Sequence, residues 1–480
     1  MIKFLYTGEG WYFFGTPEIR SYISEVNEME KNATAGRTKV ESLFDAGSFC
    51  ELGAYRKRAD GGLTGVVCGY GAIGGKLVYA FAQDSDRKKG AFDLLQAEKI
   101  ESLYETAIKN GAPVIGIFDS AGAYVTDGAS ALSAYGKFLA VVSRASGVIP
   151  QIAVIGGICA GLAATVAACF DLVVTIKDRS GLFVNAPFLT GKEVGMPAYA
   201  AKAGLSSITA ESEENAVAVA RKLIDLLPAT SEEGVYEEDT TDDANRTVSV
   251  KDDMKETISE IADAGTFLEI SAGFADEMVT GLARFGGVAC GIVANGTLND
   301  GRISADGARK AAKLIRLCDA FGLPVITLID SRGIDPASDG ERAPLAAQLG
   351  KLAMSYATAD TAKITVVIGK AYGAAFTLMG SRALGADVVY ALPDAEISTM
   401  EPASAVAFLW NDRITETVSR DALVEEWIQS CASPQAAAVD GSVDDIIDPA
   451  ELRQRICAAV YMLLEKNNSD PARKHCNLPL

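Results

Sequence analysis

Two short glycine-rich stretches carry the residue types with which this chain could do chemistry. The stretch VIGGICAGL at 154–162 and the stretch VIGKAYGAA at 367–375 each have the pattern of a buried strand that stops at glycine and passes into a helix of small residues. Such a turn leaves backbone N–H groups at a helix N-terminus, and their partial positive charge can hold an oxyanion without any ionisable side chain. We therefore predict an oxyanion hole at each turn.

The candidate donors at the first turn are the N–H groups of Gly161 and Leu162, with Gly122 and Ala123 approaching from a neighbouring strand end. An alternative stays open, because glycines at such a turn also allow a helix to pack closely on a sheet. The same turn occurs twice, which favours the chemical interpretation.

At the second turn the candidate donors are Gly373 and Ala374, with Gly333 nearby. Asp119 and Asp330 end the neighbouring strands, and an Asp followed by Ser-x-Gly is more typical of a turn than of a catalytic carboxylate. We predict a structural role for both aspartates.

A basic cluster, Arg87, Lys88 and Lys89, precedes a predicted helix at 91–110 in an otherwise acidic chain. It suits either a phosphate contact or a solvated loop. The net charge of −19 argues against nucleic acid or an anionic membrane as a bulk partner.

Several classes of site are excluded by what the chain lacks. Its one histidine, His475, lies in a polar tail, so neither a Ser-His-Asp triad nor an HExxH zinc site is available. The nine cysteines form no CxxC pair, which argues against a zinc ribbon and predicts reduced thiols in the cytoplasm. No metal is expected in this chain.

The stretch 145–170 contains no charged residue and is long enough to span a bilayer. Its counterpart in the second half is interrupted by Lys363 and Lys370. We therefore expect buried core of a soluble protein and no direct membrane insertion.

The two turns belong to a longer internal repeat. DAGSFCEL at 45–52 returns as DAGTFLEI at 263–270, and APVIGIFDSAG at 112–122 returns as LPVITLIDSRG at 323–333, at nearly constant spacing and in the same order as the turns. Blocks that recur in one order indicate a duplicated domain.

The repeat predicts an α/β fold with two domains, at 1–230 and 247–480. Strands such as PVIGIF and IAVIG alternate with helical segments, which predicts right-handed crossovers and a largely parallel sheet in each domain. The first domain is expected to begin with a helical arm at 1–40. A solvated acidic linker is predicted at 231–246, and a frayed end after 466. Further helices are expected at 130–145, 161–169, 254–262 and 304–320.

The chain resembles the carboxyltransferase subunits (beta type) of biotin-dependent acyl-CoA carboxylases, most of all the propionyl-CoA and methylmalonyl-CoA type. The blocks that carry the resemblance are LFDAGSFCELG, KNGAPVIGIFDSAGA, ASGVIPQIAVIGGICAG, KAAKLIRLCDAFGLPVITLID and KAYGAAFTLMGS, within 36–464. The resemblance implies two crotonase-like (ClpP/crotonase) domains built from ββα superhelix units.

It also implies a division of labour between the domains. The acyl-CoA thioester would lie on the first domain, and carboxybiotin, on a separate carrier protein, on the second. The residues implied for the acyl-CoA side are Gly161, Leu162, Gly122, Ala123, Ala160, Arg87, Lys88 and Lys89, and those for the biotin side are Gly333, Tyr372, Gly373 and Ala374. The two sites would meet between subunits of a dimer or a trimer of dimers.

The chain departs from the family pattern at three places. The family's Gly-Gly-Ala-Arg is replaced by Ala121 to Tyr124, its paired glycines by Gly161-Leu162, and its Pro-Gly-Phe by Arg332 to Ile334. The sequence therefore leaves open which acyl chain is used and whether Tyr124, Leu162 and Arg332 reduce activity.

The function implied is transfer of a carboxyl group between carboxybiotin and the α-carbon of propionyl-CoA or acetyl-CoA, a transferase or ligase component. Its partners would be a biotin carboxyl carrier protein and a biotin carboxylase subunit. One alternative is the carboxyltransferase of a methylmalonyl-CoA or glutaconyl-CoA decarboxylase, with membrane subunits as partners. Another is a non-catalytic scaffold of such a complex. A biotin-independent hydratase is disfavoured, because the second turn would then have no purpose.

Overall fold

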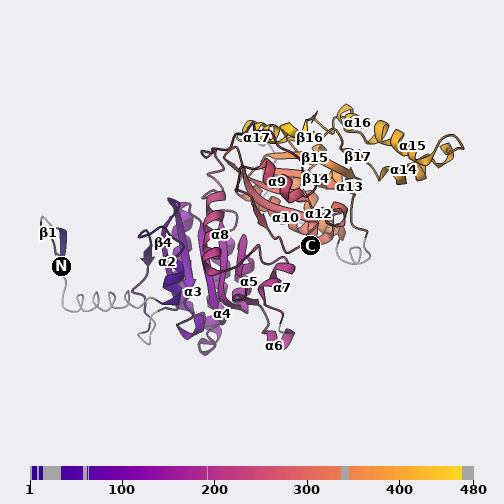
Figure 1. The fold of residues 1–480 in the computed structure, drawn as a ribbon. Coiled ribbons are helices and arrows are strands. Elements are labelled where there is room, and N and C mark those ends of the chain that lie inside the picture. The colour runs from indigo at the N-terminus through magenta and orange to yellow at the C-terminus, as the bar shows by residue number, and fades with distance from the viewer. Residues whose placement is uncertain are drawn as a thin grey trace.

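The computed structural model describes residues 3–7, 10–14, 34–57, 62, 64–191, 193–336 and 345–466. Most of these residues form two sheets with helices around them, which Figure 1 shows as an indigo-to-magenta body and an orange body. The predicted frayed end after 466, with His475, lies outside the described residues.

The first sheet runs in the order β10-β8-β7-β6-β5-β4-β3. Its first three strands in the chain pair antiparallel and the others pair parallel, and β9 joins β7 beyond the end of β8. The strands are β3 (Cys50–Leu52), β4 (Val66–Ile73), β5 (Lys76–Gln83), β6 (Val114–Ser120), β7 (Gln151–Ala160), β8 (Leu172–Ile176), β9 (Gly181–Phe183) and β10 (Ile208–Ala210).

The second sheet repeats this plan in the order β11-β12-β13-β14-β15-β16-β18, with β17 on β15 as β9 is on β7. Its strands are β11 (Leu268–Ile270), β12 (Met278–Phe285), β13 (Val288–Asn295), β14 (Val325–Ser331), β15 (Lys363–Tyr372), β16 (Val388–Ala391), β17 (Glu396–Ser398) and β18 (Asp445–Ile446). In each half an antiparallel hairpin is followed by a long helix, the expected ββα unit. The predicted α/β fold of two duplicated crotonase-like domains is confirmed.

The predicted helices form close to the expected positions: α3 (Leu94–Asn110), α4 (Ala129–Ala145), α5 (Leu162–Ala168), α9 (Met254–Ile261) and α10 (Ala305–Ala320). Helix α3 is capped at both ends. The Asp93 carboxylate accepts the Gln96 N–H at 2.9 Å, and Gly111 ends α3 in the left-handed conformation.

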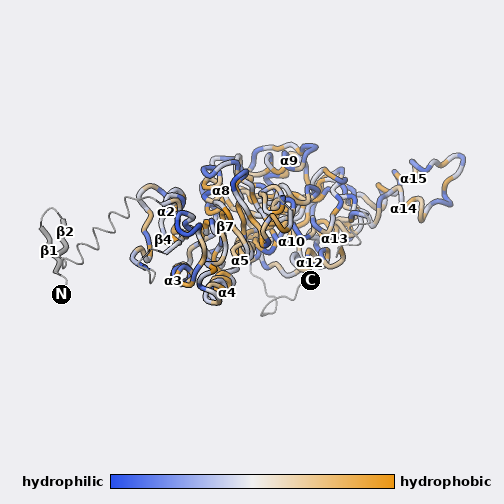
Figure 2. Tube along the Cα trace, turned by 90° about the horizontal axis from the view of Figure 1, so that it is seen from below, coloured by the Kyte–Doolittle hydropathy of each residue, from blue (hydrophilic) through white to orange (hydrophobic). Residues whose placement is uncertain are grey.

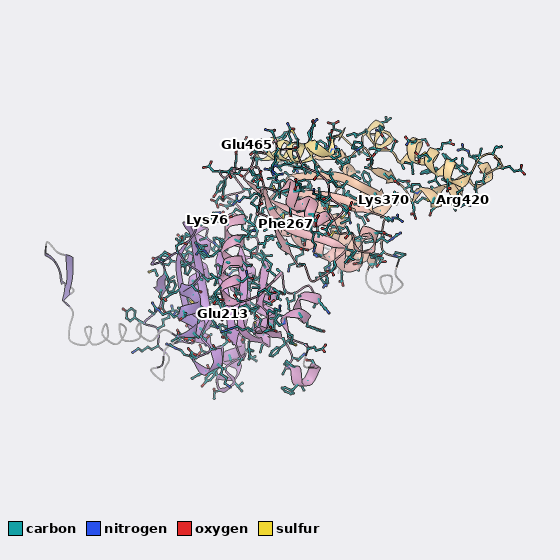
Figure 3. All side chains as sticks on the ribbon, viewed as in Figure 1. Lys76, Glu213, Phe267, Lys370, Arg420 and Glu465 are labelled. Atoms are coloured by element: carbon teal, nitrogen blue, oxygen red, sulfur yellow. The ribbon has the colours of Figure 1, made fainter. Side chains whose placement is uncertain are left out.

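The other helices are α2 (Ala35–Glu41), α6 (Pro187–Thr190), α7 (Pro197–Lys202), α8 (Glu213–Leu226), α12 (Leu345–Thr358), α13 (Ala374–Leu378), α14 (Pro402–Leu409), α15 (Arg420–Trp427), α16 (Pro434–Val439) and α17 (Leu452–Leu463). Helices α14 and α15 project from the second body in Figure 1, and Figure 3 labels Arg420 on this projection.

The expected helical arm at 1–40 is wrong in its first part. Strands β1 (Lys3–Thr7) and β2 (Gly10–Phe14) pair antiparallel there, residues 15–33 lie outside the described residues, and helix α2 (Ala35–Glu41) forms at the end of the expected arm. The sequences of both strands are rich in aromatic residues, which favour strands over helices.

No described helix is long and apolar enough to cross a membrane. The uncharged stretch at 145–170 consists mainly of strand β7 and the short helix α5. Strand β7 lies inside the sheet with helices over it, so its first six residues are all buried.

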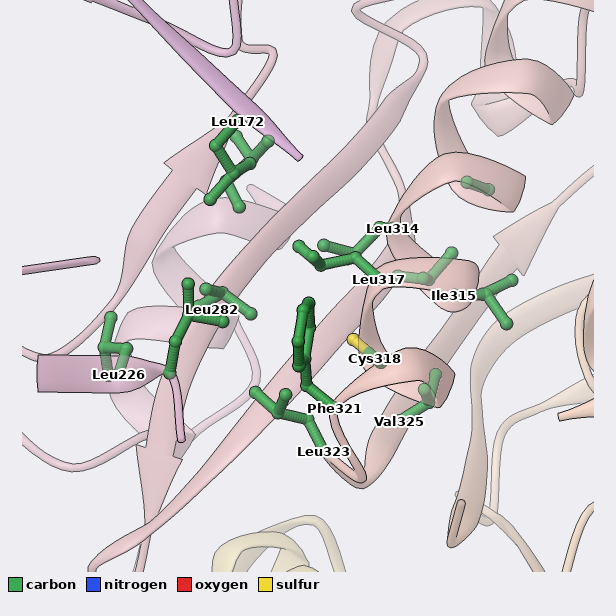
Figure 4. Packing of buried hydrophobic residues seen from close by; sticks show 14 of the residues in the cluster. Leu172, Leu226, Leu282, Leu314, Ile315, Leu317, Cys318, Phe321, Leu323 and Val325 are labelled. Carbon is green, nitrogen blue, oxygen red and sulfur yellow. The ribbon is translucent and has the colours of Figure 1, made fainter. Parts of the chain in front are cut away.

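One apolar cluster joins the two domains. It contains Leu172 and Leu226 from the first domain and Leu282, Leu314 and Phe321 from the second, all nearly fully buried. Figure 4 shows these side chains converging between the two halves, and Figure 2 shows apolar residues gathered along the middle of the molecule. The domains are therefore packed on each other through apolar surface.

The acidic segment at 231–246 has no buried residue, as its composition predicts, but it is tied to both domains. The Glu238 N–H donates to the Gly287 carbonyl, and its carboxylate meets Arg284 at 2.9 Å and Lys76 at 3.5 Å. Figure 3 labels Lys76 at the edge of the first domain that faces the second. Glu238 thus links a cation of each domain, which sequence composition alone does not reveal.

A buried arginine anchors the next part of this segment. The Arg453 side chain is inaccessible to solvent and donates to Asp263 at 2.6 Å, to the Ile261 carbonyl at 2.8 Å and to the Asp243 carbonyl at 3.0 Å. The Asp263 carboxylate also accepts the N–H groups of Gly286 and Gly287. The guanidinium thus ties α17, the segment and the β12–β13 turn together.

We expect Arg453→Met to lower the free energy of unfolding by about 3–5 kcal/mol, because it leaves the Asp263 charge buried without its partner. The measurement is urea unfolding followed by far-UV circular dichroism. Arg455→Met is the matched control, since Arg455 lies on the same helix with an exposed side chain. Equal stability of the two variants would contradict this account of Arg453.

Candidate active site

The two glycine turns lie at the carboxyl ends of β7 and β15, and an aspartate holds each strand end in the same way. The Asp119 carboxylate accepts the Ile158 N–H at 3.3 Å, and the Asp330 carboxylate accepts the Lys370 N–H at 2.8 Å. In both sheets the register shifts beside the aspartate. Both aspartates therefore have the structural role that we predicted, at an irregularity of the neighbouring strand.

The glycines of the two turns adopt a conformation that other residues rarely adopt. Gly161 has φ 64° and ψ −129°, and Gly373 has φ 58° and ψ −134°. The Gly161 N–H donates to the Phe183 carbonyl at 2.9 Å and the Gly373 N–H to the Ser398 carbonyl at 2.8 Å. The prediction that these two N–H groups are oxyanion donors is therefore wrong, because strands β9 and β17 already accept them.

The next residue along each turn is better placed to donate. Leu162 and Ala374 are the first residues of helices α5 and α13, so their N–H groups have no acceptor within the helix. The Leu162 side chain is 38% exposed, so the larger residue at this position stands at the surface of the turn.

The second donor of each predicted hole comes from the adjacent strand end. Gly122 donates its N–H to the Ser120 hydroxyl at 3.2 Å, so this glycine too is occupied. The Phe92 N–H donates to the Gly122 carbonyl and the Tyr124 N–H to the Phe92 carbonyl, each at 2.8 Å. In this parallel pairing the N–H of the middle residue, Ala123, points away from Phe92.

The second copy has the same arrangement with one residue that sequence reasoning missed. The Gly333 N–H donates to the Ser331 hydroxyl at 3.2 Å. The Ile303 N–H donates to the Gly333 carbonyl and the Asp335 N–H to the Ile303 carbonyl, each at 3.0 Å. The N–H of Ile334 therefore takes the place of the Ala123 N–H. The signal for it was the repeat, which aligns DSRGI with DSAGA.

The glycine of each strand end lies against the turn. A Cβ atom on Gly122 would lie 3.7 Å from the Ala160 carbonyl oxygen, and one on Gly333 would lie 3.6 Å from the Tyr372 carbonyl oxygen. The structure thus places Gly122 against Ala160, two residues before Leu162, and Gly333 against Tyr372, two residues before Ala374.

The second turn carries a polar pair that the first lacks. The Tyr372 hydroxyl donates to Glu396, and Arg332 meets Glu401 at 3.2 Å. Burial, followed by the hydrogen bond to Glu396, raises the pKa of Tyr372 well above its usual value. The Tyr372 side chain, predicted to contact biotin, is thus engaged with Glu396, and only its main chain faces Gly333.

A cavity of about 370 Å³ opens beside the second turn. Its walls come from the turn, from β17 and from the helices after α14, and they include Gly373, Phe376, Ile397, Thr399, Trp427 and Cys431. The Trp427 indole N–H donates to the Ser398 hydroxyl at 3.4 Å, which fixes this wall against β17.

The basic cluster flanks the first turn. Lys88 and Lys89 have positive φ angles of 49° and 54°, and the Lys89 carbonyl accepts the Ala121 N–H at 3.0 Å. The Lys88 amine donates to the Tyr124 hydroxyl at 2.9 Å. Arg87 turns away from this loop, since its guanidinium donates to the Thr64 carbonyl at 3.2 Å and meets Asp84 at 3.4 Å.

The second copy has the same backbone in this loop with different charges. Asn299 and Asp300 replace the two lysines, each with φ 53°, and the Asp300 carbonyl accepts the Arg332 N–H at 3.1 Å. The backbone therefore does not require lysine at these positions. The positive charge is specific to the first turn.

Throughout the part of the chain that the structure describes, no group of His, Cys, Asp and Glu side chains is arranged to hold a metal ion. Burial raises the pKa of the Cys159 thiol, on β7 beside the first turn, far above its usual value. That thiol is therefore protonated and not a nucleophile.

Comparison with known proteins places this geometry in a family. Residues 27–478 match the model of the carboxyl transferase domain. The alpha subunit of methylmalonyl-CoA decarboxylase from Veillonella parvula is 35% identical over 92% of each chain. The methylmalonyl-CoA carboxyltransferase 12S subunit from Propionibacterium freudenreichii subsp. shermanii is 34% identical over 92% of this chain and 91% of its own.

A solved structure agrees. The transcarboxylase 12S crystal structure, a hexamer with methylmalonyl-coenzyme A and methylmalonic acid bound, matches with a TM-score of 0.90 and 32% identity. The match covers 97% of this chain and 100% of that one. The chain thus belongs to the carboxyl transferase family, and it is a carboxyltransferase of the biotin-dependent acyl-CoA type.

Proposed function

We propose that this chain transfers a carboxyl group between carboxybiotin, delivered on a separate carrier protein, and the α-carbon of a short acyl-CoA, propionyl-CoA or acetyl-CoA. The observation that carries the proposal is the pair of equivalent turns, each with a helix-end N–H and a strand-end N–H at the same place. Two such sites suit a reaction with two carbonyl groups that each gain negative charge.

The first turn is assigned to the thioester. Leu162 and Ala123 donate to the thioester oxygen as the α-carbon loses its proton, which stabilises the enolate. The lysines beside this turn support the assignment, because coenzyme A carries phosphates and the equivalent loop of the second domain has Asn299 and Asp300 instead.

The second turn is assigned to biotin, with Ala374 and Ile334 donating to its ureido oxygen. Carboxybiotin, when bound there, would supply CO2 by breaking its N–C bond, and the biotin ureido group left behind would supply the base for the α-proton. The chain therefore needs no side-chain base, which agrees with its single histidine. The cavity lined by Gly373 and Trp427 offers room next to this turn.

Exposed apolar side chains support assembly through both domains. Val125, Phe188 and Leu189 of the first domain are 87%, 85% and 72% exposed, and Phe408 on the projecting helix α14 is 79% exposed. Apolar patches of this kind mark interfaces. We propose that a second copy covers them, so that the first turn of one chain faces the second turn of another, in a dimer or a trimer of dimers.

The same half-reaction in reverse is the alternative. The relatives from Veillonella parvula and Propionigenium modestum are alpha subunits of methylmalonyl-CoA decarboxylase, at 35% and 34% identity. Net direction then depends on whether a biotin carboxylase subunit or membrane subunits receive the carrier protein. In either case this chain acts on the cytoplasmic side.

Biotin dependence is tested with methylmalonyl-CoA and biocytin, by following loss of the CoA ester. We expect Gly373→Ala to lower this turnover about 10²- to 10³-fold, because a Cβ atom is strained at this φ and ψ and displaces the Ala374 N–H. Gly265→Ala is the control, since Gly265 also has a positive φ, 72°, with open space around it. Turnover of the wild type without biocytin would contradict the proposal.

The acyl pocket is tested by Leu162→Ala, which copies the residue of the second turn. We expect kcat/KM for branched or longer malonyl-type thioesters to rise about tenfold relative to malonyl-CoA, because one side chain is removed beside the thioester. Leu132→Ala, an exposed leucine of α4, serves as the control. An unchanged ratio would place the acyl chain elsewhere.

The phosphate contact is tested by Lys89→Gln. We expect KM for the acyl-CoA to rise about fivefold with kcat nearly unchanged, because an exposed charge pair of this kind contributes about 1 kcal/mol. Higher salt should reduce the difference between variant and wild type. Lys137→Gln, an exposed lysine on α4, is the matched control. A fall in kcat alone would remove Lys89 from the binding site.

A further inference from the structure

A cavity of about 150 Å³ lies between the two domains. We call it the interdomain cavity. The first domain contributes Asp171, Leu172 and Gly204 to its wall, and the second contributes Ile270, Ser271, Phe274, Thr280, Arg309, Lys310, Lys313, Leu314 and Leu317. Two hydrogen bonds cross between the domains beside it, from the Ser271 N–H to the Ser207 carbonyl at 2.6 Å and from Arg309 to the Ala203 carbonyl at 3.4 Å.

The cavity has a positive rim and an apolar floor. Arg309 and Lys313 follow each other by one turn of α10 on the side that faces the first domain. Figure 4 shows Leu172 of the first domain opposite Leu314 and Leu317 of this helix. The cavity thus combines cations with hydrocarbon, inside a chain whose net charge is −19.

Comparison with the first copy of the repeat shows that Lys310 has a structural role that Arg309 and Lys313 do not share. Lys310 corresponds to Lys99 in helix α3. The Lys310 amine donates to the Phe274 carbonyl at 2.7 Å, and the Lys99 amine donates to the Val66 carbonyl at 3.0 Å. Arg309 and Lys313 have no such reason to be basic, because their counterparts in α3 are Glu98 and Ser102.

The two rim cations keep capacity for a ligand. Arg309 stacks over the Phe274 ring at 4.6 Å and meets Asp306 at 3.2 Å in an exposed pair. Among the described residues, no acidic side chain lies within ion-pair distance of Lys313. Its side chain is open at the rim, yet desolvation by the cavity walls lowers the pKa of its amine.

Besides Asp306, the acid Asp171 of the first domain lies in the cavity wall near these cations. The Asp171 carboxylate accepts the Gln151 N–H at 2.8 Å, and burial raises its pKa to about 6. The Asp171 carboxylate is therefore already engaged with the main chain of its own sheet, and it only partly offsets the positive charge of the rim. The equivalent Asp387 of the second domain has its own lysine partner, Lys466, at 3.0 Å.

We propose that the interdomain cavity binds a short aliphatic carboxylate, with its carboxylate group between Arg309 and Lys313 and its hydrocarbon chain on the leucine floor. A cavity of about 150 Å³ takes up benzene in another protein, and butyrate has as many heavy atoms as benzene. An inorganic oxyanion would suit the cations but would leave the floor without apolar contact. Because both domains form the wall, the ligand fastens them together.

The test is isothermal titration calorimetry of the full chain with butyrate, at an ionic strength kept constant with sodium chloride. We expect saturable binding of one butyrate per chain, weakened at least tenfold in Arg309→Gln and in Lys313→Gln and unchanged in Lys137→Gln. The neutral analogue butyramide should not bind, because it cannot pair with the cations.

Three results would overturn the proposal. Butyrate could give no saturable heat, or it could bind Arg309→Gln and Lys313→Gln as tightly as the wild type, which would place it at another site. Inorganic phosphate could bind more tightly than butyrate and lose its binding in the same two variants, which would make the cavity an oxyanion site. Circular dichroism spectra of both variants identical to the wild type establish that lost binding is not lost folding.

Discussion

The hydrogen bond from a glycine N–H to a short outer strand is the constraint on which both turns depend. Gly161 is held by the Phe183 carbonyl and Gly373 by the Ser398 carbonyl, in nearly equal φ and ψ. With the glycine fixed in this way, the next N–H begins a helix with no internal acceptor and points out of the sheet. A donor that is preorganised by the main chain costs no reorganisation during the reaction. Strands β9 and β17, each of three residues, thus have an importance beyond their length.

Duplication makes the two domains informative about each other. Where the copies agree, as in the aspartate at the strand end and the Ser-x-Gly that follows it, the shared residues build the backbone of the turn. Where they differ, the difference marks what each turn binds. One such difference is that the first domain has Lys88 and Lys89 where the second has Asn299 and Asp300. Another is that Ala160 of the first domain is replaced by Tyr372, which is hydrogen-bonded to Glu396. The first turn thus has lysines beside it and the small residue Ala160 in its strand, whereas the second has the hydrogen-bonded pair of the Tyr372 hydroxyl and the Glu396 carboxylate.

The repeat, the helices and both turns were predictable from the sequence, because apolar periodicity and glycine position are local signals. The identity of the donors was not. Gly161 and Gly373 looked like donors since a glycine often opens a helix, and only the pairing of β9 with β7 and of β17 with β15 shows that their N–H groups are taken. Ile334 was missed because its N–H matters through pairing with Ile303, thirty-one positions earlier. The segment at 231–246 is exposed to solvent, as its composition predicts, but its contacts with Arg453 and Arg284, far away in the chain, cannot be read from composition.

These distant contacts bear on how the two turns work together. If the first turn of one chain faces the second turn of another, the two domains within each chain must be placed accurately for both sites to close. Three features fix that placement: the apolar cluster around Leu282 and Phe321, the bridge from Lys76 through Glu238 to Arg284, and the bond from Ser271 to Ser207. Lys76 and Glu238 keep about a third of their side chains exposed to solvent, so their pair contributes little stability and serves mainly to orient the domains. The interdomain cavity lies at this same junction, and none of its wall residues belongs to either turn.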